Sequence, residues 1–255
     1  MKRQTISIFP LLIMGVLLVF ASSCEKDDDN NPASDNPASD NPTNGKTTPV
    51  FNPNVTYGSM TDQDGNVYKT VTIGTQTWMA ENLRTTTYND GTAIPNVTDD
   101  DEWGSSTTGA YCNYNNNTSE DTIATYGRLY NWYAVNTGKL APTGWHVPTD
   151  AEWKELTDYL GGEDVAGGKL KETGTTHWYI PNEGATNETG FTALPGGYRY
   201  LDGSFYFIGR YGYWWSATEY NTDNAWYRTM YYLPSNVGRY YPSKELGFSV
   251  RCVRD

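Results

Sequence analysis

Apolar residues follow three patterns along the chain. An almost unbroken apolar run extends from Ile6 to Phe20, residues 24–50 contain almost nothing apolar, and from residue 51 onward short apolar and polar stretches alternate. A tract rich in Pro, Asn, Ser and Asp cannot offset the entropy of ordering its backbone. The pattern therefore predicts a leader over 1–23, a disordered tether over 24–50 and one folded domain over 51–255.

The leader has the features of a signal peptide. Lys2 and Arg3 precede the apolar run, which is about 15 residues long and shorter than the roughly 20 that a membrane-spanning helix needs. The run leads into Phe20-Ala21-Ser22-Ser23-Cys24, which resembles a bacterial lipobox. That resemblance implies that Cys24 is acylated and anchors the protein in a membrane. The alternative is an ordinary secretory peptide with an incidental cysteine.

The tether contains a short repeat. Two copies of Asn-Pro-Ala-Ser-Asp occupy 31–35 and 36–40, and a degenerate third copy begins at Asn41. Such a segment holds a domain at a distance from its anchor. The acidic cluster 25–29 resembles the surface-export signal of Bacteroidetes lipoproteins, which implies an outer-membrane lipoprotein exposed on the cell surface. The alternative is a charged start to a solvated linker.

Strand patterns begin and end the predicted domain. Turns at Asp64-Gly65 and Gly74-Thr75 flank Val67–Ile73, and Gln76–Met79 follows, which predicts a hairpin. Polar residues dominate 85–121, where we expect loops with short strands around Tyr111 and Tyr114. Further strands are predicted at Tyr198–Leu201, Ser204–Ile208, Tyr213–Thr218, Ala225–Tyr232 and Phe248–Val253.

The clearest helix signal follows Pro148. Thr149 and Glu152 form a capping box, and a stripe of Trp153, Leu156 and Leu160 predicts a helix that packs on a sheet and stops at Gly161-Gly162. Helical spacing also predicts a short helix within 126–135. A second one is predicted over Val165–Glu172, although two glycines inside it weaken the signal.

Composition and charge narrow the range of functions. The chain has 21 Tyr, 9 Trp and 25 Gly, which predicts an aromatic, loop-rich core. Its net charge is -12, and removing residues 1–23 takes away two basic residues and no acidic one, giving -14. Such a chain is a poor partner for nucleic acid or anionic lipid, so neither is expected to be a ligand.

Six ordered blocks of the domain together resemble a known family. They are Ile73-Gly74-x-Gln76-x-Trp78-Met79-Ala80-Glu81-Asn82-Leu83, Gly127-Arg128-Leu129-Tyr130-Asn131-Trp132, Gly144-Trp145-His146-Val147-Pro148-Thr149-Asp150-Ala151-Glu152-Trp153, Gly190-Phe191-x-Ala193-Leu194-Pro195-Gly196-Gly197, Trp214-Trp215-Ser216-Ala217-Thr218 and Gly247-Phe248-Ser249-Val250-Arg251-Cys252-Val253. Across roughly 57–255 they resemble the Fibrobacter succinogenes major paralogous domain of exported Bacteroidetes and Fibrobacteres proteins.

Two of these blocks also resemble the sulfatase-modifying-factor group. These are Pro148 to Trp153 and the Arg251-Cys252 ending. The fold of that group is a variant of the C-type lectin fold. The resemblance implies an α+β, C-type-lectin-like domain with a twisted, mostly antiparallel sheet, one or two short helices and long loops.

The same resemblance bears on catalysis. Oxidase members of the sulfatase-modifying group bind copper through two cysteines about five and ten positions before the final Arg-Cys, where this chain has Gly247 and Pro242. Without paired thiolates that chemistry is not expected. The only histidines, His146 and His177, lie in separate blocks and are interpreted as structural rather than as a metal site. We therefore predict a protein that is not an enzyme.

The remaining cysteines leave two alternatives. Cys112 and Cys252 form one disulfide in an oxidising environment, or they are two buried free thiols. Relatives often have Cys-Pro before Gly-Trp-His, whereas this chain has Ala141-Pro142, so the resemblance does not decide the pairing.

A calcium site is a weaker hypothesis. Sugar-binding C-type lectins carry Glu-Pro-Asn or Gln-Pro-Asp, and this chain has Ile180-Pro181-Asn182 instead. Oxygen ligands nevertheless gather in the loop that follows, so a structural calcium has weak candidate ligands in Asn182, Glu183, Asn187 and Glu188. No other cofactor is predicted.

Aromatic side chains near loops and strand ends are the best candidates for ligand binding. Tryptophan and tyrosine stack on sugar rings and anchor protein partners at low entropic cost. The candidates are Trp103, Trp178, Tyr206, Tyr211, Tyr213 and Trp226, and the alternative for each is a place in the core.

We thus predict a lipid-anchored envelope protein whose domain binds a glycan or a protein. A carbohydrate-active or redox enzyme and a structural component of a surface assembly are the alternatives.

Overall fold

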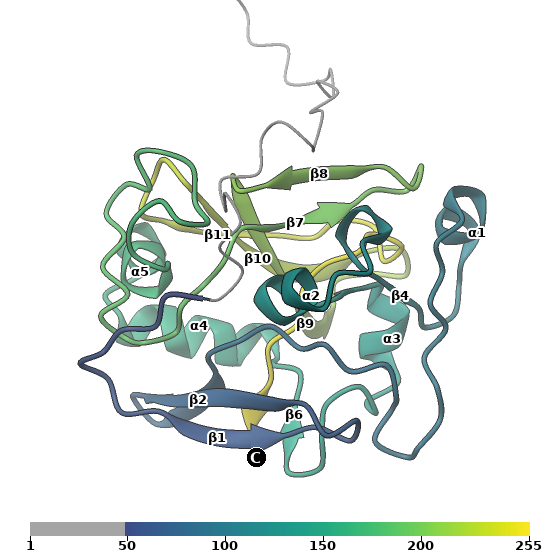
Figure 1. The fold of residues 1–255 in the computed structure, drawn as a ribbon, viewed down its shortest axis with the longest axis horizontal. Coiled ribbons are helices and arrows are strands. Elements are labelled where there is room, and N and C mark those ends of the chain that lie inside the picture. Colours follow the sequence, from purple (N-terminus) through teal and green to yellow (C-terminus); the bar gives the residue numbers. More distant parts are fainter. Residues whose placement is uncertain (1–48) are drawn as a thin grey trace, which may run out of the picture. The chain divides into compact units, whose positions relative to one another are not determined.

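The computed structural model describes residues 49–255, so Cys24, the leader and nearly all of the tether lie outside the described residues. Within this range no helix is long and apolar enough to cross a membrane. Short helices and mostly antiparallel sheets make up an α+β arrangement (Figure 1).

The largest sheet joins the two ends of the domain. Its five strands have the order β1-β2-β3-β12-β6, and every neighbouring pair is antiparallel. The strands are β1 (Gly58–Thr61), β2 (Val67–Ile73), β3 (Gln76–Met79), β6 (Trp145–His146) and β12 (Val253–Arg254). The predicted hairpin is therefore confirmed as β2 and β3.

A second sheet of three strands has the order β11-β10-β9 and is also antiparallel. Its strands are β9 (Tyr211–Glu219), β10 (Ala225–Tyr231) and β11 (Val237–Tyr240). Two further hairpins pair β4 (Tyr111–Cys112) with β5 (Leu129–Tyr130) and β7 (Gly196–Arg199) with β8 (Phe205–Ile208).

The predicted strand Phe248–Val253 is wrong for most of its length. Phe248 and Ser249 make only isolated bridges, to Tyr130 and Trp214, and the regular strand is limited to β12. The segment contacts several different elements in turn, so no single partner strand gives it a continuous ladder.

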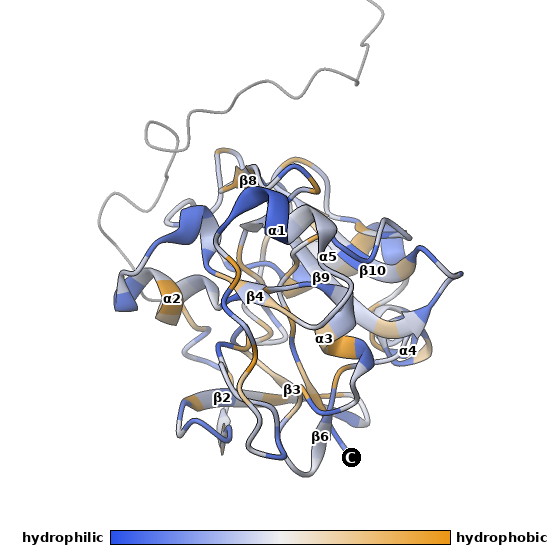
Figure 2. Ribbon diagram, turned by 90° about the vertical axis from the view of Figure 1, so that its right-hand side faces the viewer, coloured by the Kyte–Doolittle hydropathy of each residue, from blue (hydrophilic) through white to orange (hydrophobic). Residues whose placement is uncertain are grey.

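Five α-helices of ten residues or fewer occur in the described residues, where residue patterns predicted three and the family resemblance implied one or two. They are α1 (Asp100–Ser105), α2 (Glu120–Tyr126), α3 (Trp132–Asn136), α4 (Asp150–Tyr159) and α5 (Glu163–Leu170), and a 3-10 turn at Tyr114–Asn116 replaces the strand expected near Tyr114. In Figure 2 most of α1 is hydrophilic, whereas α3 carries hydrophobic residues.

The helix predicted within 126–135 is divided because the backbone turns at Gly127. This glycine has a φ of 74° and ends α2, and Asn131 then caps α3 by accepting a hydrogen bond from the Ala134 N–H. Similar caps at Asp99 and Ser119, which begin α1 and α2, were signals that the sequence analysis missed.

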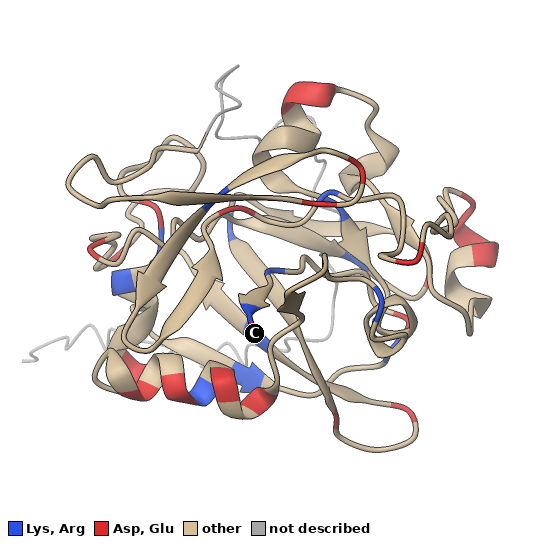
Figure 3. Ribbon diagram, turned by 90° about the horizontal axis from the view of Figure 1, so that it is seen from below, with Lys and Arg blue, Asp and Glu red and all other residues tan. Residues whose placement is uncertain are grey.

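Helix α4 agrees with its prediction. Both hydrogen bonds of the Thr149 and Glu152 capping box are present, and Trp153, Leu156 and Leu160 pack with β2 and β3 residues in one hydrophobic cluster. Its outer face carries acidic residues on both sides of Lys154 (Figure 3). The apolar stripe therefore determines which side of the helix faces the sheet.

The two glycines in α5 are needed for close packing. A Cβ atom at Gly167 would lie 2.4 Å from the Asn236 carbonyl oxygen, and one at Gly168 would lie 2.5 Å from that of Gly184. These contacts compensate for the low helix propensity of glycine, which explains why the predicted helix forms.

A buried arginine joins three of the irregular segments. The Arg251 guanidinium is fully buried and donates hydrogen bonds to the Asn82 Oδ1 atom (2.8 Å), the Phe191 carbonyl and the Thr192 carbonyl (2.8 Å). The Asn82 Oδ1 atom also accepts a hydrogen bond from the Trp214 indole N–H at 2.9 Å. Four of the six sequence blocks thus meet at one guanidinium.

Replacing Arg251 with methionine should lower the free energy of unfolding by about 3–5 kcal/mol, because two buried carbonyls lose their donor and the Asn82 amide oxygen keeps only the Trp214 indole N–H. Urea denaturation measures this loss. The matched control is Arg254→Met, at an exposed position, which should change stability by less than about 0.5 kcal/mol. Equal stability of the two variants would show that the buried arginine does not hold these segments together.

Candidate functional site

An aromatic groove lies on one face of the three-stranded sheet. Trp214, Met230 and Val237 pack on one side of the sheet in a cluster with α4 and α5 residues, and the alternate residues therefore project from the opposite side. There, five tyrosines and Phe207 line a groove of about 360 Å³, which we call the tyrosine groove. The tyrosines are Tyr211, Tyr213, Tyr227, Tyr231 and Tyr240.

The rings of the groove support one another. Tyr211 and Tyr231 are opposite each other in the strand register and stack at 4.1 Å between ring centroids, with 15° between their planes. Tyr213 stacks on Phe248, which lies beneath it in the core, at 5.1 Å. Such ring pairs each contribute about 0.5–1.5 kcal/mol beyond the burial of their area. The groove is therefore a preformed surface.

Phe207 holds an unusual backbone conformation at the edge of the groove. Its φ is 64°, a region that bulky residues rarely adopt and that costs about 1–3 kcal/mol. Its ring contacts Tyr211 at 5.2 Å and Tyr198 at 5.9 Å. These contacts compensate for the strain and keep the ring against the groove.

No residue that lines the tyrosine groove is charged. Besides the aromatic residues, the lining consists of Thr229, Pro234, Asn236 and Gly238. Burial, with a smaller effect of neighbouring tyrosines, raises the pKa values of Tyr213 and Tyr227 well above the usual value, so both hydroxyls stay neutral. The groove therefore offers ring faces, hydroxyl groups and one amide to a ligand.

Asp150 attaches the sheet behind the groove to α4. Its carboxylate binds Arg228 at 2.8 Å and Arg239 at 2.9 Å. Partial burial alone would raise the pKa of Asp150, but hydrogen bonds from both guanidiniums outweigh it and lower that pKa. The groove tyrosines therefore project from a sheet whose opposite face is tied to α4.

The six predicted aromatic residues have different places in the fold. Tyr211 and Tyr213 line the groove, and Tyr206 lies beside it, 6.0 Å from the Phe207 ring. Trp226 belongs to a separate group with Tyr220 and Tyr241.

For Trp103 and Trp178 the core alternative is correct. Their exposed fractions are 1% and 0%, which leaves no surface for a ligand. Trp103 stacks under the Arg199 guanidinium at 4.7 Å, and Trp178 donates its indole N–H to the Ala193 carbonyl.

The sequence analysis missed Tyr227, Tyr231 and Tyr240. The first two are four residues apart on a predicted strand, and period-two spacing places them on one face. That signal was available. The position of Tyr240 beside Tyr227 depends on strand β11, which was not predicted.

The proposed calcium ligands make contacts within the protein. The Asn187 amide exchanges hydrogen bonds with Thr192, Asn182 donates to the Glu172 and Gly174 carbonyls, and Glu188 lies 3.3 Å from Lys169. Glu183 is exposed. Within residues 49–255, no three or more His, Cys, Asp or Glu side chains are grouped so as to hold a metal ion.

Both described cysteines are free and buried, which is the second of the two alternatives. They belong to different hydrophobic clusters. Burial raises the pKa of Cys112 to about 12 and raises that of Cys252 further, so neither thiol is a reactive thiolate at neutral pH.

Each histidine pairs with carboxylates of its own, as the structural interpretation expects. His177 is fully buried and its Nδ1 atom lies 2.7 Å from Glu172 Oε2. His146 is partly exposed and lies 2.7 Å from Glu152 and 2.6 Å from Asp255. Burial alone would lower the pKa of His146, but the two carboxylates outweigh it and raise that pKa.

The two thiols provide a test of the cysteine assignment. In a soluble Cys24→Ser chain, a chromogenic thiol reagent should react with neither Cys112 nor Cys252 under native conditions, because both are buried and protonated. After denaturation without a reductant, it should titrate both of them. A denatured chain without reactive thiols would instead demonstrate a disulfide.

The His146 contacts should make stability depend on pH. Because folding raises the pKa of His146, protonated His146 stabilises the folded state. This stabilisation is complete below the pKa of the unfolded chain, about 6.5, and is lost as the pH rises through the pKa of the folded protein. Thermal unfolding between pH 5.5 and 9 should therefore show a decrease in Tm that is smaller in His146→Gln. Identical pH profiles for the two proteins would contradict this role of the histidine.

A comparison with protein families identifies the domain. The family model described as Fibrobacter succinogenes major domain matches residues 71–254, which is most of the chain. Comparisons with curated proteins and with solved structures gave no match. The protein is thus a member of the Fibrobacter succinogenes major domain family.

Proposed function

We propose that this domain is a non-catalytic glycan-binding module whose binding site is the tyrosine groove. The observation that carries the proposal is the uncharged aromatic lining of the groove on an acidic chain. Sugar rings stack on aromatic faces, and their hydroxyl groups pair with tyrosine hydroxyls and the Asn236 amide. A neutral oligosaccharide fits this chemistry better than an anionic one.

The proposal includes a lipid anchor and a cell-surface position. Both rest on the signal peptide, Cys24 and the acidic cluster 25–29. The tether would then present the groove to ligands outside the outer membrane. Mass spectrometry of the native protein finding an unmodified Cys24 would remove the anchor from this proposal.

A C-type-lectin-like fold is also part of the proposal. It is supported by the resemblance of Pro148 to Trp153 and of the Arg251-Cys252 ending to the sulfatase-modifying-factor group. The α+β architecture with mostly antiparallel sheets is compatible with it.

A second candidate function is binding to a protein partner within a surface assembly. The favouring observation is an exposed aromatic group in which Tyr220 and Tyr241 stack at 3.7 Å, beside Trp226. The Arg239 guanidinium lies 3.5 Å from the Trp226 ring centroid. Aromatic residues and arginine are enriched in protein interfaces.

Binding of neutral oligosaccharides tests the glycan proposal. A soluble Cys24→Ser chain should bind a member of a neutral glycan array, and Tyr231→Ala should weaken that binding by about 30-fold, the loss of one stacked anchor worth about 2 kcal/mol. Tyr159→Ala is the matched control, since Tyr159 is an exposed tyrosine on α4 outside the groove. Absence of binding, or equal binding by Tyr231→Ala, would refute the proposal.

A further inference from the structure

The tyrosine groove is longer than a single sugar ring. The strand register arranges most of its lining in three cross-strand rows, which are Tyr211 with Tyr231, Tyr213 with Thr229 and Gly238, and Tyr227 with Tyr240. Tyr227 and Tyr231 are four residues apart on β10, a span of about 13 Å at the rise of a β-strand. A ligand that fills the groove from end to end must therefore be an extended molecule.

Aromatic rings connect the two ends of the groove. Tyr213 in the middle row lies 5.6 Å from Tyr211 and 5.9 Å from Tyr227, measured between ring centroids. Tyr227 lies in turn 6.0 Å from Tyr240. Tyr213 is only 8% exposed, whereas Tyr240 is 55% exposed and Tyr231 is partly exposed. The groove therefore has two accessible aromatic ends joined by a buried ring.

The end at Tyr231, which we call the Tyr231 end, has the larger number of groups. Phe207 and Pro234 line it together with Tyr211 and Tyr231, and the Phe207 ring contacts Tyr211. Lys171 holds the last part of this end, since its Nζ atom donates to the Tyr231 carbonyl at 2.9 Å and to the Pro234 carbonyl at 3.1 Å. A ligand of one or two sugar units should therefore bind at the Tyr231 end.

The opposite end, which we call the Tyr240 end, depends on a glycine. Gly238 precedes Tyr240 by two residues on β11, so both face the same side of the sheet. A Cβ atom at Gly238 would lie 2.7 Å from the Tyr240 Cε2 atom and 2.8 Å from the Thr229 Cγ2 atom. The Tyr240 ring thus lies close over the backbone of β11, and its exposed side forms a platform at this end.

The shape and chemistry of the groove favour one class of glycan. Its lining is uncharged, and ring faces bind the apolar faces of sugars. The sugar chains of cellulose, linear mannan and xylan are extended, whereas those of amylose coil. Because the groove follows a strand, an extended chain can contact both ends and a coiled chain turns away from one of them.

We propose that the ligand of the tyrosine groove is a linear neutral oligosaccharide with the extended backbone of cellulose, mannan or xylan, lying along β10. One sugar unit stacks at the Tyr231 end, and a later unit of the same chain stacks on Tyr240. The Asn236 amide and the tyrosine hydroxyls bind sugar hydroxyl groups. This inference rests on the glycan proposal and adds the length and shape of the ligand to it.

Calorimetric titration of the soluble Cys24→Ser chain with oligosaccharides of cellulose, linear mannan and xylan tests the proposal. In at least one series the hexasaccharide should bind about 30-fold more tightly than the disaccharide, because only the longer chain gains the second stacked anchor. Oligosaccharides of amylose are the comparison series and should show no such gain. A hexasaccharide that binds no more tightly than its disaccharide, or an equal gain in the amylose series, overturns the inference.

Variants at the Tyr240 end locate the second anchor. Tyr240→Ala should weaken hexasaccharide binding by about 30-fold and leave disaccharide binding unchanged, since the short ligand occupies the Tyr231 end. Gly238→Ala keeps every aromatic side chain but displaces the Tyr240 ring, so it should have the same selective effect. Tyr241→Ala is the matched control at an exposed tyrosine outside the groove and should change neither affinity. Equal losses for both ligands in Tyr240→Ala, or no loss for either, would contradict the two-ended site.

These measurements separate this inference from the glycan proposal. If no neutral glycan binds the unaltered chain, both fail. If a neutral glycan binds but none of the cellulose, mannan and xylan oligosaccharides does, or if affinity depends neither on chain length nor on Tyr240, only the extended site fails.

Discussion

Buried cations bonded to backbone carbonyls hold the irregular segments of this domain in place. Arg251 is the central case, because within residues 49–255 its guanidinium pairs with no carboxylate and instead donates to the Phe191 and Thr192 carbonyls and the Asn82 amide oxygen. Lys171 and Arg199 also donate to backbone carbonyls of other loops, and Arg199 in addition pairs with the Asp100 carboxylate at 2.8 Å. Buried carbonyls outside helices and sheets need donors, and long cationic side chains supply several at once.

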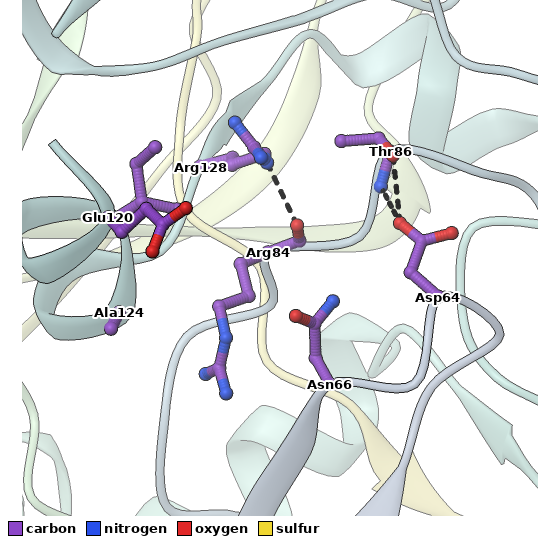
Figure 4. A pocket seen from close by; sticks show the side chains of 8 residues that line it. Asp64, Asn66, Arg84, Thr86, Glu120, Ala124 and Arg128 are labelled. Atoms are coloured by element: carbon purple, nitrogen blue, oxygen red, sulfur yellow. Dashed lines mark hydrogen bonds between the residues drawn. The ribbon is translucent and has the colours of Figure 1, made fainter. Parts of the chain in front are cut away.

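Because buried cations fix the loops, the faces of the regular strands can be used for a binding surface. The three-stranded sheet is covered by α4 and α5 on one side and tied to α4 through Asp150, so its other side can carry the tyrosines of the groove. A second hollow, of about 430 Å³, lies instead among loops, between the turn at Asp64–Asn66, the segment Arg84–Thr86 and helix α2 (Figure 4). The sheet and the loops thus provide two surfaces of different chemistry.

The sequence predicted those features whose signals are local. The β2–β3 hairpin and the capped helix α4 depend on turn residues, periodicity and capping within about a dozen positions. Trp103 and Trp178 could not be placed in this way, because a polar neighbourhood in sequence does not reveal that a distant segment covers the ring. A buried Arg251 is equally hidden, since arginine is usually exposed and its acceptors are far away in the chain.

The first turn of α4 gives the domain an unequal response to acid. Asp150 and Glu152 are both ionised partners of basic groups there, and hydrogen bonds, against the effect of partial burial, lower the pKa of each. Stability from such groups is lost as pH falls through their folded pKa values. None of the acceptors around Arg251 titrates in acid. Acidification therefore weakens the contacts of the first turn of α4, whereas the hydrogen bonds that join the sequence blocks at Arg251 keep their acceptors.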